Sequence, residues 1–127
     1  MNLNKIIESN DVDKYTFGRF VRNRREELGK TVRSFAKELD ITAAYLSDIE
    51  KGNRYAPKAK LEMMFKLLRI PADQKLAFMD LASLTRGEIE DLNPYLGRSS
   101  AARLALRTAE EINLSDEKWL AFIKTMK

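Results

Sequence analysis

The sequence predicts an all-α protein, and two observations support this fold class. Glycine and proline are scarce, with 5 and 3 residues in a chain of 127, so few positions interrupt a helix. Apolar residues recur along most of the chain at the spacing of one helical face, and each run ends at a glycine, a proline or a short polar turn. We therefore expect a succession of short helices.

Three helices are expected between residues 16 and 52, after an arm or short extra helix at residues 1–15. Thr31 and Thr42 can cap the second and third helices, and Gly29 and Gly52 can end the first and third. The bounding residues are Thr16 and Gly29, Thr31 and Leu39, and Thr42 and Gly52.

Two further helices are expected after Pro57 and over residues 72–85, with Pro71 between them. The second of these is apolar on nearly every side, which is typical of a helix buried between a domain and a partner chain. The remaining expected elements are a short turn at residues 89–96 interrupted by Pro94, a helix over about residues 100–113, and a last helix after Ser115.

The composition excludes several kinds of function. The sequence contains no cysteine and no histidine, so it cannot form disulfides, zinc sites with those ligands, or Ser-His and Cys-His catalytic arrangements. It also lacks a glycine-rich phosphate loop, and we expect no enzyme activity, cofactor or metal. No apolar run reaches about 18 residues and no signal peptide is apparent, so we expect a cytoplasmic protein without a membrane partner.

The charge is unevenly distributed along the chain, although the net charge is only +4. Residues 1–70 contain 15 Lys and Arg against 10 Asp and Glu, whereas residues 71–127 contain 8 against 9. A basic first half beside a nearly neutral second half indicates that the first part binds an anion and the second binds protein.

The most informative stretch is Thr31 to Gly52, TVRSFAKELDITAAYLSDIEKG. Two short helices joined by a tight turn, with a small residue where they cross, are typical of a helix-turn-helix. Ala36 is that small residue, and Asp40 stands at the turn position that needs a left-handed backbone, which aspartate tolerates. Thr42 can cap the second helix.

Residues 16–70 resemble the XRE family of lambda-type phage repressors and their bacterial relatives. The residues that carry the resemblance are Arg25, Leu28, Gly29, Phe35, Ala36, Leu39, Ile41, Thr42, Tyr45, Leu46, Ser47, Ile49, Glu50, Gly52 and Pro57. The resemblance implies a lambda-repressor-like five-helix DNA-binding domain, followed here by a helical C-terminal extension. It also implies a structural ion pair between Arg25 and Glu50.

By family position, the helix at residues 42–51 lies in the major groove of DNA. The residues that would face bases are Ala43, Ala44, Tyr45 and Asp48. The residues that would contact phosphate are Lys30, Arg33, Ser34, Lys37, Ser47, Lys51, Asn53, Arg54 and Lys58. Arg54 could instead enter a minor groove. Because the base-facing set lacks arginine, glutamine and asparagine, we expect phosphate contacts and DNA shape to contribute much of the binding.

The sequence departs from the family pattern at two positions. The family usually has glutamine where this chain has Val32, so one DNA contact is lost. It usually has glycine in the turn, where this chain has Asp40.

The expected organisation is an arm at residues 1–15, a DNA-binding domain at 16–70, and a helical segment at 71–127 for dimerisation or partner binding. The dimerisation candidates are Leu76, Phe78, Met79, Trp119, Ile123 and Met126. We expect a transcriptional regulator that binds double-stranded DNA in a sequence-specific way, as a homodimeric repressor. Two alternatives remain open: an antitoxin that binds a toxin or another regulatory protein, and an interaction module that has lost DNA binding.

Overall fold

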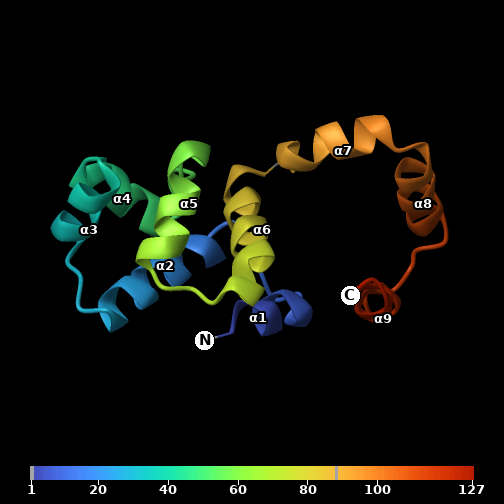
Figure 1. The fold of residues 1–127 in the computed structure, drawn as a ribbon, viewed down its shortest axis with the longest axis horizontal. Coiled ribbons are helices and arrows are strands. Elements are labelled where there is room, and N and C mark those ends of the chain that lie inside the picture. The colour runs from blue at the N-terminus through green and yellow to red at the C-terminus, as the bar shows by residue number, and fades with distance from the viewer. Residues whose placement is uncertain (1, 88) are drawn as a thin grey trace. The chain divides into compact units, whose positions relative to one another are not determined.

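The structure is a computed structural model that describes residues 2–87 and 89–127. Within these residues every regular element is a helix, which confirms the all-α fold class (Figure 1). The chain divides after Ile89 into two compact units. None of the described helices is both long and apolar enough to span a membrane.

The first unit contains six α-helices among the described residues, and the last five are those expected from the sequence. The helices are α1 (Leu3–Ser9), α2 (Thr16–Glu27), α3 (Val32–Leu39), α4 (Ala43–Glu50), α5 (Lys58–Leu67) and α6 (Lys75–Arg86), with a 3-10 turn at Ala72–Gln74 before α6. In Figure 1, α3 and α4 lie side by side at one end of this unit, where they pack against each other. Helix α2 packs against both α4 and α6.

Phe78 of α6 lies in the core of the first unit. Its side chain is 0% exposed, and its ring centroid is 5.2 Å from that of Phe17 and 5.8 Å from that of Phe65. The expectation that Phe78 contacts a partner chain is corrected here, because the side chain is already covered by its own unit. Leu76, on the other side of α6, is 82% exposed, so this helix is not buried all round.

Helix α1 is a folded part of the first unit. Leu3 is fully buried, and its backbone N–H donates to Oε1 of Gln74 at 2.9 Å. Gln74 is itself buried, and the nearby Asp73 carbonyl accepts from the Asn4 amide at 3.0 Å. The first unit therefore includes both α1 and α6, beyond the 16–70 range expected from the sequence.

The second unit contains three α-helices among the described residues 90–127. They are α7 (Asn93–Arg98), α8 (Ser100–Glu111) and α9 (Asp116–Thr125), after a 3-10 turn at Glu90–Leu92. Ser99 caps α8 and Ser115 caps α9, each accepting from a backbone N–H of the first turn. Pro94 stands in the first turn of α7, so it begins a helix there and does not interrupt one, because its missing N–H has no helical partner at that position.

Candidate nucleic-acid interface

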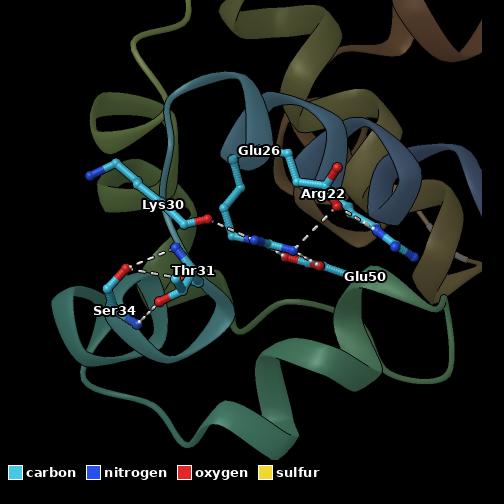
Figure 2. A network of polar contacts seen from close by, with 7 residues as sticks. Arg22, Glu26, Lys30, Thr31, Ser34 and Glu50 are labelled. Atoms are coloured by element: carbon cyan, nitrogen blue, oxygen red, sulfur yellow. Dashed lines mark hydrogen bonds and ion pairs between the residues drawn. The ribbon is translucent and has the colours of Figure 1, made fainter.

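The start of α3 is fixed by reciprocal hydrogen bonds between Thr31 and Ser34. The Ser34 N–H donates to Thr31 Oγ1 at 3.0 Å, and the Thr31 N–H donates to Ser34 Oγ at 3.0 Å (Figure 2). This pair is a capping box, which satisfies backbone donors that a helix start leaves free. The Ser34 hydroxyl, a predicted phosphate contact, is thus already engaged in the cap.

The turn between α3 and α4 is built as the sequence predicts. Asp40 has φ 56° and ψ 46°, the left-handed conformation expected at this position. The Ile41 N–H donates to the Ala36 carbonyl at 3.0 Å, which closes the end of α3. Thr42 Oγ1 then accepts from the Tyr45 N–H at 3.0 Å and caps α4. Local side-chain chemistry therefore sets the angle at which α4 leaves α3.

Gly18 lets α4 pack directly on α2, a role that was not predicted from the sequence. A Cβ atom at this position would lie 2.5 Å from the Glu50 carbonyl oxygen and would also clash with the Ile49 carbonyl. Those carbonyls belong to the last turn of α4. The available signal was a glycine inside a helix, where it is intrinsically unfavourable and usually has a packing reason.

Arg25 holds the end of α4 through the ion pair implied by the family resemblance. Its Nε lies 2.7 Å from Glu50 Oε2, its Nη2 lies 3.0 Å from Oε1, and its Nη1 donates to the Lys30 carbonyl at 2.7 Å. Arg25 and Glu50 are 6% and 8% exposed, so this pair supports the scaffold. The hydrogen bonds to Glu50 raise the pKa of Arg25 above its usual value.

The Arg25 network continues to the surface of α2, as Figure 2 shows. Arg25 Nη2 lies 3.8 Å from Glu26 Oε1, and that carboxylate also accepts from Arg22 Nε at 2.9 Å. The hydrogen bond from Arg22 lowers the pKa of Glu26 below its usual value. Helix α4 is thus linked to α2 by a chain of charged groups that begins in the interior and ends in solvent.

The predicted base-facing residues lie on the accessible surface of α4. Ala43 and Ala44 are exposed, and Tyr45 and Asp48 are half-buried. Leu46 and Ile49, on the opposite side of the helix, are buried in the core. The first turn of α4 is therefore open to a ligand, while its other face seats it on the unit.

Most of the predicted phosphate contacts are exposed cations or amides around α4. The exposed or half-exposed members are Arg33 and Lys37 on α3, Lys51, Asn53 and Arg54 after α4, and Lys58 at the start of α5. Two others differ from this set. Lys30 is half-buried, and its Nζ lies 2.8 Å from Glu38 Oε1, while Ser47 is half-buried within α4.

Val32, which replaces the usual glutamine of the family, packs partly against the core of the first unit. It begins α3 directly after the Thr31 cap. An apolar side chain at this position contributes packing and has no donor or acceptor for DNA.

The Arg54 side chain lies over the ring of Tyr45. The guanidinium carbon is 4.2 Å from the ring centroid, which is close enough for a cation–π contact. The sequence analysis assigned Tyr45 to bases and Arg54 to phosphate or a minor groove, and it did not predict their contact with each other.

A short helix, a left-handed turn and a capped second helix with an exposed first turn together define a helix-turn-helix protein. Residues 16–78 match the family model described as a helix-turn-helix domain. The uncharacterized HTH-type transcriptional regulator YazB of Bacillus subtilis (strain 168) is 38% identical over 58 residues, which cover 46% of this chain and 84% of that relative. The chain belongs to this helix-turn-helix family of transcriptional regulators. No solved structure gives a significant match.

Proposed function

We propose that this protein is a sequence-specific repressor of the XRE type that binds double-stranded DNA as a homodimer, with α4 in the major groove. The observation that carries the proposal is the exposed first turn of α4, bordered by cations from α3, from the loop after α4 and from the start of α5. A helix enters the major groove by such a turn, and cations beside it meet the phosphates.

The XRE assignment is supported by the buried pair Arg25 and Glu50, which the resemblance implies and which holds α4 from its inner side. The turn before α4 keeps a left-handed backbone although Asp40 replaces the usual glycine. Ala43 and Ala44 of the base-facing set are exposed and take no part in this ion pair. The residues that hold α4 are thus different from Ala43 and Ala44, which suits a protein whose DNA-facing residues can vary on a constant scaffold.

The dimer proposal rests on the second unit, which covers little of its own apolar surface. Among the described residues 90–127, Ala109 is the one apolar residue that is buried. An open groove of about 610 Å³ runs between α8 and α9, and its lining includes Leu104, Trp119 and Phe122. Units of fewer than about 40 residues rarely bury enough surface to be stable alone, so a second molecule on this groove would add burial that the unit lacks.

The charges at the ends of α8 and α9 favour a second copy of the chain as the partner. Helix α8 runs from basic Arg107 to acidic Glu110 and Glu111, whereas α9 runs from acidic Asp116 and Glu117 to basic Lys124. In a two-fold dimer, equivalent helices that run antiparallel place each acidic end beside the partner's basic end. Of the earlier candidates, the exposed Ile123 and Met126 and the half-buried Trp119 remain in this proposal.

DNA binding is tested by selecting duplexes from a random library with the full chain and measuring their affinity across a salt series. We expect enrichment of one two-fold sequence, with half-sites about 34 Å apart, and a preference of about a thousandfold over unrelated DNA. Replacing Lys51 with alanine should reduce the salt slope by about one, while the matched change Lys66→Ala on α5 should not. Failure to enrich any sequence contradicts the proposal.

Dimerisation is tested by sedimentation of two leucine variants on α8. Leu104 lines the groove and is 66% exposed, whereas Leu106 lies outside its lining and is 46% exposed. We expect Leu104→Ser to dissociate the dimer and Leu106→Ser to leave it intact. A wild-type chain that sediments as a monomer at micromolar concentration contradicts the dimer and leaves the groove to a different protein.

A further inference from the structure

Helix α4, which the proposed function places in the major groove, lacks a side chain suited to bidentate base recognition. Its exposed or half-buried residues are Ala43, Ala44, Tyr45, Ser47 and Asp48. Sequence-specific contacts in the major groove depend chiefly on arginine or lysine with guanine, and on asparagine or glutamine with adenine. A bidentate contact with a purine therefore needs a side chain from outside α4.

The structure places the cation of Arg54 over the ring of Tyr45 in α4. Its guanidinium carbon lies 4.2 Å from the centroid of the Tyr45 ring, although the residue itself belongs to the loop after the helix. Tyr45 is fixed in the first turn of α4, where its N–H donates to Thr42 Oγ1. Although Arg54 follows α4 in the sequence, its guanidinium therefore lies beside the first turn of that helix, which is proposed to face the bases.

The loop that carries Arg54 is held on both sides of this residue. Before it, Gly52 has φ 79°, and a Cβ there would lie 2.5 Å from Cδ1 of Tyr15. After it, the ring of Tyr55 lies 4.5 Å from the guanidinium carbon of Arg86, and Ala56 is 3% exposed. A loop anchored in this way limits the conformations open to Arg54, so less entropy is lost when its side chain binds.

We infer that Arg54 is a specificity-determining residue that donates to O6 and N7 of a guanine in the major groove, and that Tyr45 is its positioning residue. A guanidinium held over an aromatic ring keeps several N–H groups that can still donate to a base. Lysine cannot reproduce this planar fork. The inference rests on the proposed DNA-binding function and names the base that the site recognises.

The test uses the operator selected with the full chain and a set of duplexes that change each base pair in turn. Affinity is measured for the wild type, Arg54→Lys, Tyr45→Leu and Tyr45→Phe. We expect Arg54→Lys and Tyr45→Leu to lower the discrimination at the same guanine-bearing base pair by about 10-fold, with the other positions unchanged. Tyr45→Phe keeps the ring, so it should restore discrimination at that base pair relative to Tyr45→Leu.

Lys51→Ala is the control for a contact with phosphate, since it removes an exposed cation from the same loop. It should weaken binding to all duplexes by a similar factor. If Arg54→Lys or Arg54→Ala also weakens all duplexes equally, Arg54 contacts phosphate and the inference is overturned while the DNA-binding function stands. A wild-type chain that selects no operator overturns both.

Discussion

The two units of this protein differ in how much of their apolar surface they cover. In the first unit, the side chains of Phe17, Phe35 and Phe78 are no more than 1% exposed. In the second unit, Leu104 and Ile112 are 66% and 63% exposed, and Phe122 is 51% exposed. Both units consist of amphipathic helices, so the pattern of single helices does not explain the difference.

The difference lies in how many helices share a common interior. In the first unit, α2 contacts both α4 and α6, and α6 also contacts α1 and α5. In the second unit, α7 contacts α8, and α8 and α9 line an open groove. The first unit thus buries its own apolar side chains, whereas the second leaves apolar side chains exposed along an open groove.

The largest expected effect comes from shortening one aromatic side chain in each unit. Phe78→Ala removes a fully buried ring and should lower the free energy of unfolding by about 4 kcal/mol. Phe122→Ala changes a side chain that is 51% exposed and should lower it by less than about 1 kcal/mol in the dissociated chain. Urea denaturation followed by circular dichroism measures both. Equal losses would contradict the distinction between the two units.

Breaking the buried ion pair of the first unit should have the next largest effect. Arg25→Ala leaves the Glu50 carboxylate, which is 8% exposed, without its guanidinium and should cost about 3 kcal/mol. The double variant Arg25→Met, Glu50→Leu removes both charges and should recover most of that loss. Urea denaturation of the wild type and the two variants gives the comparison. A double variant as unstable as Arg25→Ala would show that the carboxylate is not the source of the loss.

A methyl group at the contact between α2 and α4 should produce an intermediate effect. Gly18→Ala places a Cβ 2.5 Å from the Glu50 carbonyl oxygen, so the helices must separate, and overpacking of this kind costs about 2 kcal/mol. Gly97→Ala is the control in the second unit, since a Cβ at Gly97 meets no atom within 4 Å. Thermal denaturation should distinguish them. A Gly18 variant as stable as the wild type would mean that α4 can shift on α2 without cost.

The smallest effect is expected from removing a helix cap, and the two units offer caps of the same kind. Thr42 caps α4 and Ser115 caps α9, each through a side-chain oxygen that accepts a backbone N–H. Thr42→Ala should lower the free energy of unfolding of the first unit by about 1 kcal/mol. Ser115→Ala should leave that transition unchanged and loosen only α9. Amide hydrogen exchange resolves the two units, and a Ser115→Ala variant that loses protection in α4 would contradict this expectation.

The features that the sequence predicted best are those formed by residues close together in the chain, such as helix caps and turns. The Thr31 and Thr42 caps and the left-handed Asp40 form as expected, because each depends on contacts within a few residues. Contacts between distant segments were missed. Gly18 against the carbonyls of α4 and Arg54 on Tyr45 depend on how helices pack, which spacing along one helix does not encode.

Phe78 illustrates the same limit in the core. A helix with apolar residues on nearly every side gives no sign of which side faces its own unit. The structure resolves this by placing Phe78 inward and Leu76 outward. Pro94 was misread for a related reason, since the same residue that breaks a helix interior is favourable in its first turn.

The way in which α4 is seated has a consequence for how its target can change. The helix is held by its Ile49 and Glu50 carbonyls against Gly18, and by the Glu50 side chain against Arg25. Neither attachment involves Ala43 or Ala44. Under the proposed function, we expect substitutions at Ala43 and Ala44 to change which DNA sequence is bound without lowering the stability of the fold.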